Sequence, residues 1–128
     1  MKHRVWVYLY QPELKFLMSL GELIGTNSQH EQIEFIIRLC RLMVPEAKII
    51  PIIMSNIGAL QPIMPRIGPA VRAWVYLSED DLWYLDEFMV SFNLTSRSKA
   101  IRYLIHITKL LLLKVDVVTK EVSKLLKY

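Results

Sequence analysis

The sequence predicts a mainly α-helical protein with two short β-strands. Three observations lead to this fold class. A short strand pattern occurs twice, two helix patterns follow each occurrence, and both second helices are apolar on nearly every side. The chain has 128 residues, which is the size of one domain. We therefore expect both occurrences to contribute to one hydrophobic core.

An internal repeat appears when the sequence is compared with itself at the offset that carries Arg4 onto Arg72. RVWVYL at 4–9 then meets RAWVYL at 72–77, and the match continues without a gap from 4–43 to 72–111. Identical pairs beyond the strand are Leu14/Leu82, Leu17/Leu85, Ser28/Ser96, Ile33/Ile101, Ile37/Ile105 and Leu42/Leu110. An ungapped match of this length predicts that one structural unit was duplicated.

Each copy opens with a strand whose two faces differ. One face is aliphatic, and the other is aromatic with an arginine at its head. The aliphatic positions are Val5, Val7 and Leu9, then Ala73, Val75 and Leu77; the aromatic positions are Arg4, Trp6 and Tyr8, then Arg72, Trp74 and Tyr76. Either face could be buried, but an arginine heads the aromatic face in both copies. We therefore expect the aromatic face to point outwards.

The first helix of each copy begins directly after the strand. Pro12 is suited to the first helical position in one copy. In the other, Ser78 is suited to cap the helix, and the carboxylates of 79–81 favour the positive end of its dipole. Breaks at 25–27 and 93–95 separate these helices from second helices that start at Ser28 and Ser96.

Four segments follow from this pattern: a first unit at 1–43, a connector at 44–71, a second unit at 72–111 and an amphipathic helix at 112–128. The connector holds most of the prolines but is too apolar for a solvated linker. We expect it to pack on the helices, with a short helix around 52–60. Ser28 with Glu31 has the spacing of a capping box.

The net charge and the cysteine and histidine content restrict the kinds of function that we expect of this protein. The formal net charge is +4 and the sequence pI is near 9.3, which suits a polyanionic partner, although no basic tail is present. The lone Cys40 lies in an apolar stretch, and His3, His30 and His106 lack the spacing of metal ligands or of a catalytic triad. We expect no enzyme activity, no cofactor, no metal and no small-molecule substrate, and a cytoplasmic protein without a membrane-spanning segment.

The stretch VYLSEDDLWYLDEFMVSFNLTSRSKAIRYLI at 75–105 resembles the ribbon-helix-helix family of DNA-binding proteins. The first copy matches less well, because it has Gln29-His30-Glu31 where the second has Arg97-Ser98-Lys99. Two copies in one chain resemble the duplicated members found among regulators of archaeal viruses. The resemblance implies a tandem ribbon-helix-helix fold in which the strands of the two copies pair as one short two-stranded antiparallel β-ribbon. The two copies would then form an intramolecular pseudo-dimer.

The resemblance also implies a mode of DNA binding. The ribbon would lie in the major groove with Arg4, Trp6, Tyr8, Arg72, Trp74 and Tyr76 towards the bases. The second helices would meet phosphates through Ser28, Gln29, Thr95, Ser96, Arg97, Ser98 and Lys99. A two-stranded ribbon fits the major groove, and free N–H groups at helix starts suit phosphate. Because the ribbon is rich in aromatic side chains, we expect contacts to thymine methyl groups and a preference for A·T-rich sites.

Two other functions stay open on the sequence alone. The chain could be an antitoxin whose segment 112–128 binds a toxin, or a purely protein-binding module. For a regulator, most simply a repressor, self-association through the connector or the C-terminal helix would allow cooperative binding to adjacent sites.

Overall fold

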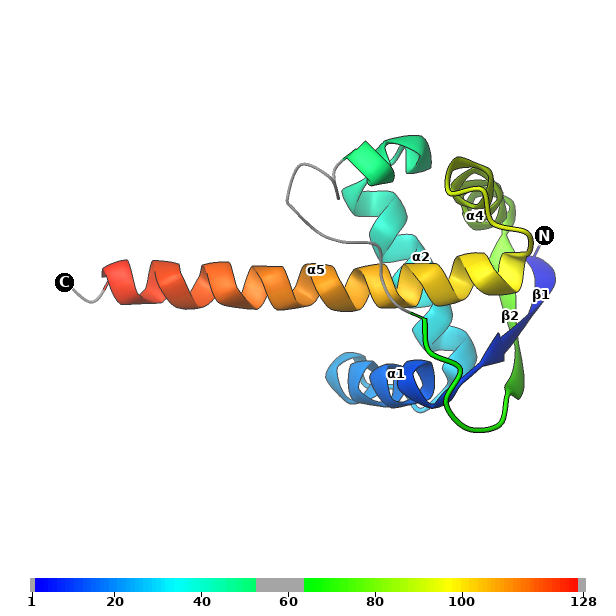
Figure 1. The fold of residues 1–128 in the computed structure, drawn as a ribbon, viewed down its shortest axis with the longest axis horizontal. Coiled ribbons are helices and arrows are strands. Elements are labelled where there is room, and N and C mark those ends of the chain that lie inside the picture. Colours follow the sequence, from blue (N-terminus) through cyan, green and yellow to red (C-terminus); the bar gives the residue numbers. More distant parts are fainter. Residues whose placement is uncertain (1, 53–63, 127–128) are drawn as a thin grey trace.

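The computed structural model describes residues 2–52 and 64–126, with the backbone alone at 111 and 113–126. It is mainly helical, with one two-stranded antiparallel sheet, as the sequence predicts. The predicted helix around 52–60 falls almost entirely on 53–63, outside the described residues. Figure 1 shows the helices gathered on one side of the ribbon.

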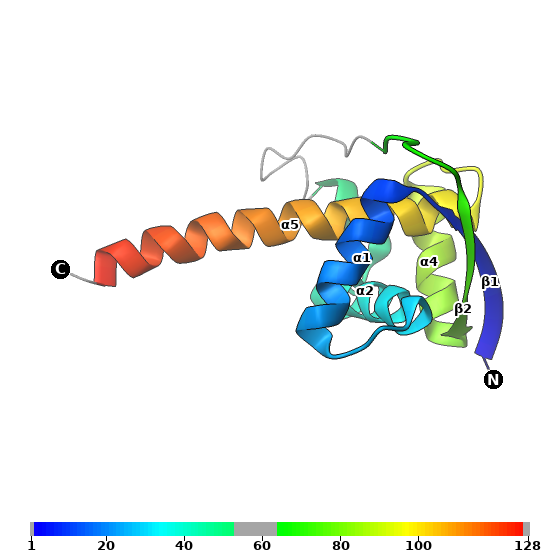
Figure 2. The ribbon, with the colours of Figure 1, turned by 90° about the horizontal axis from the view of Figure 1, so that it is seen from below.

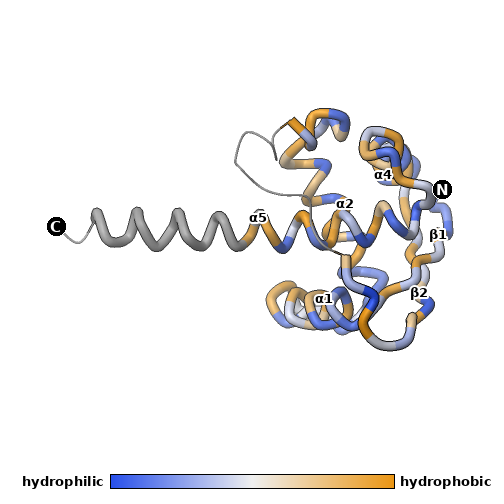
Figure 3. Tube along the Cα trace, in the orientation of Figure 1, coloured by the Kyte–Doolittle hydropathy of each residue, from blue (hydrophilic) through white to orange (hydrophobic). Residues whose placement is uncertain are grey.

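Strands β1 (Lys2–Leu9) and β2 (Val71–Ser78) form the ribbon. Their register sets Trp6 opposite Trp74, so the same position of the repeat meets itself at the centre of the ribbon. The aliphatic face is buried and the aromatic face is turned away from the core. More and less hydrophobic residues alternate from Arg4 to the end of β1 and throughout β2, and Figure 3 colours the ribbon by this property.

Helices α1 (Gln11–Ile24) and α2 (Gln29–Met43) follow β1, and α4 (Glu79–Ser91) and α5 (Arg97–Leu126) follow β2. A residue with left-handed backbone follows the first helix of each copy. Directly after α1 this is Gly25, with φ 78°, and shortly after α4 it is Asn93, with φ 56°. Glycine and asparagine tolerate this conformation best, so the breaks predicted at 25–27 and 93–95 have a local cause.

Helix α5 is continuous through the position where the sequence suggested a separate C-terminal helix. Residues 112–126 extend the second helix of the second copy, because no glycine or proline interrupts the chain there. Figures 1 and 2 show this end of α5 reaching well beyond the other elements. No helix within the described ranges combines the length and apolarity needed to cross a membrane.

The apolar second helices are covered by the opposite half of the chain. Helix α2 packs against β2, α5 packs against β1, and the two helices cross each other. At the crossing, Cys40 Sγ lies 3.5 Å from Thr108 Oγ1, and these two residues occupy the same position of the repeat. The thiol is buried, as the sequence predicts, and its burial raises the pKa of Cys40.

The described ends of the connector lie on the helices. Ala47 in the short helix η1 (Ala47–Ile49) is buried, and η1 contacts α4. At the other end, Ile67 accepts a hydrogen bond from Gln11 N–H at 3.2 Å. Arg102 in α5 donates to the carbonyl oxygens of Met64 and Pro65, both at 3.3 Å.

Glu13 is a buried carboxylate that joins the two halves of the chain. Its side chain is 0 % exposed, and it accepts hydrogen bonds from Arg102 Nε at 2.6 Å and from Tyr10 N–H at 3.1 Å. The His106 ring lies 2.9 Å from its second oxygen. Burial raises the pKa of Glu13, but hydrogen bonds from Arg102, Tyr10 and His106 outweigh burial and hold it below the ordinary value.

Asp81 has the same position in the second copy and is also fully buried. The sequence suggested that its charge serves the start of α4. Its backbone N–H does bond to Ser78 Oγ, but its carboxylate binds Arg41 at 2.9 Å and Arg38 at 3.4 Å. Both arginines lie on α2, so this ion pair also joins opposite halves of the chain.

Replacing Glu13 by Gln should destabilise the fold by about 3–5 kcal/mol, because Arg102 is itself only 4 % exposed and would keep a buried charge without its partner. Asp81→Asn should cost less, about 1–2 kcal/mol, because Arg41 retains 32 % exposure and can be hydrated. Urea unfolding measures both, with Glu22→Gln on the exposed side of α1 as control. Equal losses for the two variants would contradict the dependence on burial.

The contribution of Glu13 should also depend on pH. Because its pKa is lowered on folding, its stabilisation is complete above the ordinary value of 4.5 and is lost as pH falls through the pKa of the folded state. Unfolding free energies of the wild type and Glu13→Gln should therefore differ most near neutral pH and converge in acid. A difference that stays constant down to pH 3 would contradict this linkage.

Candidate nucleic-acid interface

The outer face of the ribbon presents a compact group of aromatic and basic side chains. Trp6 and Trp74 sit at its centre, 38 % and 42 % exposed, which is high for tryptophan in a small protein. Tyr8 and Arg72 are paired at one end of the ribbon, and Arg4 and Tyr76 at the other. All six residues predicted for base contact therefore share one face, with only Tyr76 partly buried.

The arginines are held against the aromatic rings. The Arg72 guanidinium lies 3.8 Å from the centre of the Trp6 ring, within the range of a cation–π contact. Arg4 lies 5.7 Å from the Trp6 ring and 5.9 Å from the Tyr76 ring. Such contacts restrict the arginine side chains and leave their N–H groups able to donate outwards.

Each strand is tied to the start of the opposite second helix. Tyr8 N–H donates to Ser98 Oγ at 2.9 Å, and Tyr76 N–H donates to His30 Nδ1 at 3.1 Å. Ser98 and His30 occupy the same position of the repeat. Because Nδ1 accepts here, the proton of the neutral ring is on Nε2. The ring also lies 5.8 Å from Tyr76 and 6.1 Å from Trp74.

His30 was missed by sequence reasoning, which examined histidine only for metal binding and catalysis. The repeat could have pointed to His30, because it aligns His30 with Ser98, one of the predicted phosphate-binding residues. Within the described ranges, no three His, Cys, Asp or Glu side chains are grouped as a metal site requires.

The starts of α2 and α5 are capped alike. Ser28 Oγ accepts from Glu31 N–H at 3.3 Å, and Ser96 Oγ accepts from Lys99 N–H at 3.1 Å. The predicted capping box at Ser28 is only half formed, because Ser28 N–H donates to Thr26 Oγ1 rather than to the Glu31 side chain. Glu31 therefore remains exposed at the start of α2, and its neighbour Gln29 is exposed as well.

Both cationic side chains of the predicted phosphate-binding set at α5 already have partners. Arg97 makes a two-pronged ion pair with Asp86, at 2.8 and 2.9 Å, and these hydrogen bonds raise its pKa. Lys99 Nζ donates to Thr95 Oγ1 at 2.9 Å. Because both side chains are partly exposed, their charges stay accessible from solvent.

A pocket of about 220 Å³ opens where the ribbon meets the start of α5. Its lining is Tyr8, Tyr10, Arg66, Ala70, Ser96, Ser98, Lys99 and Arg102. Arg66 and Lys99 bring positive charge to it, whereas Arg102 is already paired with the buried Glu13, and two serines lie at the positive end of the helix dipole. The pocket therefore has the charge and the donors to hold one anionic group beside the ribbon. Arg66, in the connector, was not anticipated from the sequence.

Comparisons of the chain with family models, with curated proteins and with solved structures each find no match.

Proposed function

We propose that this chain is a sequence-specific double-stranded DNA-binding regulator, most simply a repressor, that works without chemistry. The observation that carries the proposal is the ribbon: two strands whose exposed face combines two arginines with four aromatic rings, beside a cationic pocket at a helix start. The width of two paired strands suits the major groove.

The two copies act, in this proposal, as an intramolecular pseudo-dimer of ribbon-helix-helix units. The pairs related by the repeat support it. Trp6 faces Trp74, Cys40 contacts Thr108, and the buried carboxylates Glu13 and Asp81 each bind the opposite second helix. In this proposal, one two-fold axis through the ribbon centre and the helix crossing would account for all three pairs.

In this proposal, different residues contact the bases and the phosphates. On the ribbon, the arginines supply donors to guanine or phosphate, and the aromatic rings contact thymine methyl groups and sugars, which favours A·T-rich sites. The start of α5 holds a phosphate in the cationic pocket. The start of α2 is a weaker clamp, because exposed Glu31 stands where the second copy has Lys99. Unequal clamps favour a binding site that is not a palindrome.

The simplest test is selection of bound sequences from a random duplex pool, followed by gel-shift titration at physiological salt. The proposal expects an enriched, A·T-leaning site and clear preference over random DNA. Absence of binding to any duplex would overturn it. Copurification of a small toxin with the full chain, lost when 112–128 is removed, would instead support the antitoxin alternative.

The ribbon side chains should read sequence. Arg72→Ala and Trp74→Ala should each cost about 1–3 kcal/mol on the selected site and much less on random DNA. Trp83→Ala is the matched control, since it removes an exposed tryptophan from α4, away from the ribbon. Competition titrations on single-site duplexes give these values. Equal losses on selected and random DNA would argue against base contact by the ribbon.

The α5 clamp should act on every sequence alike. Arg97→Ala should weaken binding to all duplexes and reduce the slope of log K against log salt by about one unit. Asp86→Asn should strengthen binding to all duplexes, because it frees Arg97 from its ion pair. Salt titrations of the two variants against the wild type provide the measurement. An unchanged slope for Arg97→Ala would exclude a phosphate contact.

A further inference from the structure

Helix α4 carries an exposed tryptophan that the proposed DNA contact does not use. Trp83 is 66 % exposed and stands between two shallow grooves. One contains Glu87 and the exposed Val90, the other Asp80 and the exposed Leu42. The two cations that also line them are already paired, Lys48 with Glu46 at 3.9 Å and Arg41 with Asp81 at 2.9 Å. The groove residue Asp86 is paired with Arg97, so Asp80 and Glu87 carry the negative charge of this face. A large aromatic side chain flanked by apolar and acidic residues is typical of a surface that contacts protein.

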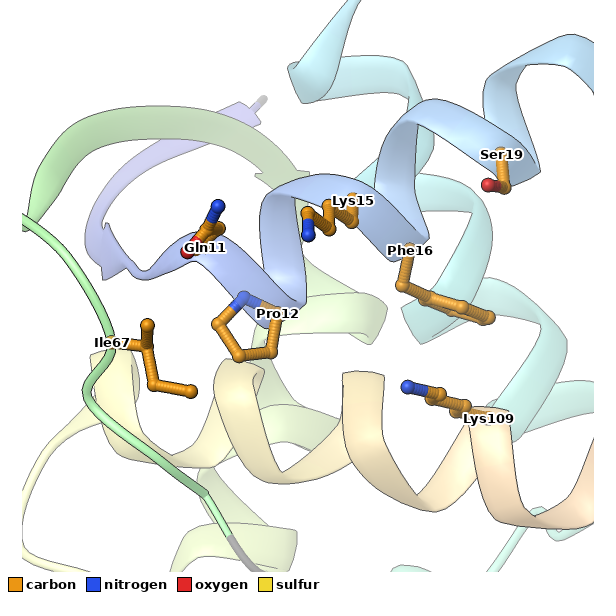
Figure 4. A pocket seen from close by; sticks show the side chains of 7 residues that line it. All are labelled: Gln11, Pro12, Lys15, Phe16, Ser19, Ile67 and Lys109. Atoms are coloured by element: carbon orange, nitrogen blue, oxygen red, sulfur yellow. The ribbon is translucent and has the colours of Figure 1, made fainter.

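The corresponding side of α1 is different. There the repeat replaces Trp83 by Lys15, and a groove of about 380 Å³ lies between α1, α5 and the connector. Figure 4 shows Lys15 and Lys109 on opposite sides of it, with Phe16 between them and Pro12 and Ile67 towards one end. The described residues that line this groove include two lysines and no acid. An indole ring in it would meet an apolar floor and two cations.

Helices α1 and α4 lie on opposite sides of the body, as Figure 1 shows. Contact between two α4 faces would bring Asp80 and Glu87 against the same acids of another copy. Contact between two α1 faces would bring lysine against lysine. Like charges across an interface are unfavourable, whereas α4 of one copy against α1 of another pairs acids with lysines.

We propose that copies of this chain associate head to tail, with Trp83 of one copy in the groove between Lys15 and Lys109 of the next. Such a contact leaves one free α4 face and one free α1 groove, so it extends into open chains rather than closing as a dimer. The surface is small for a stable complex, so the association is weak and appears at high protein concentration. It does not depend on DNA binding and is tested without DNA.

Cysteine cross-linking distinguishes the possible contacts. Ser19→Cys labels the α1 groove and Ser91→Cys labels the α4 groove, while the native Cys40 is buried. With a flexible bis-maleimide at high protein concentration, a mixture of the two single variants should form dimers, and the double variant should form a ladder. The wild type measures any background from Cys40.

Other outcomes overturn the proposal. Dimers formed by Ser91→Cys alone would show an α4–α4 contact, and dimers formed by Ser19→Cys alone an α1–α1 contact. Failure of the mixture to cross-link would exclude the head-to-tail contact. Because these experiments contain no DNA, their failure leaves the proposed DNA binding untouched.

A second variant tests Trp83 itself. Trp83→Lys installs the residue that the first copy has at this position, and its exposure makes the change compatible with folding. In the double-cysteine background it should abolish the ladder with an unchanged circular dichroism spectrum. Leu23→Lys, an exposed apolar position of α1 outside the groove, is the matched control and should leave the ladder intact. A ladder that persists in Trp83→Lys would overturn the proposal.

Discussion

The burial of α2 and α5 is the constraint on which the rest of the structure depends. Residues 100–108 of α5 are buried on every side, and α2 buries the face that runs from Ile33 to Cys40, which is more than one strand and one first helix can cover. Helix α2 packs on β2, α5 and both first helices, and α5 packs on β1, α2 and both first helices. Neither half of the chain has a complete core by itself, so the ribbon, the helix crossing and the buried ion pairs form together.

This mutual cover also positions the candidate interface. The ribbon lies over the crossing of the second helices because its aliphatic face completes their core. Its aromatic face is then exposed by necessity, since side chains alternate along a strand. The bonds from Tyr8 to Ser98 and from Tyr76 to His30 bring each helix start to the edge of the ribbon. Groups suited to bases and groups suited to phosphate thus share one side of the molecule.

Much of this was predictable from the sequence because it depends on local patterns. Alternation in 4–9 and 72–77 predicts the strands, and Gly25 and Asn93 mark the ends of the first helices through their backbone preferences. The sequence pattern did not predict where charged groups find partners. Asp81 looks like a dipole-capping residue because its neighbours are acidic, whereas its arginines come from α2, forty residues or more away along the chain.

The continuous α5 and the role of His30 were missed for related reasons. The amphipathic pattern over 112–128 predicted a further helix, but no glycine or proline separates these residues from the helix that begins at Arg97, so the helix continues into them. The role of His30 is to accept a hydrogen bond from the Tyr76 N–H. The sequence does not give the strand register that places these two groups side by side. Asp86 is likewise identified as the partner of Arg97 only from the three-dimensional structure.

The order of the strands along the chain has a consequence for biosynthesis. Every ladder partner of β1 lies in β2, from Leu9 with Val71 to Lys2 with Ser78, so the ribbon cannot begin to form until the second strand has been made. During translation α1 and α2 leave the ribosome before β2 has been made, and their apolar surfaces stay exposed to solvent until then. Pairing between such distant segments also slows folding. Because both strands belong to one chain, the ribbon needs no second molecule to form, but it cannot form until residue 78 has been synthesised.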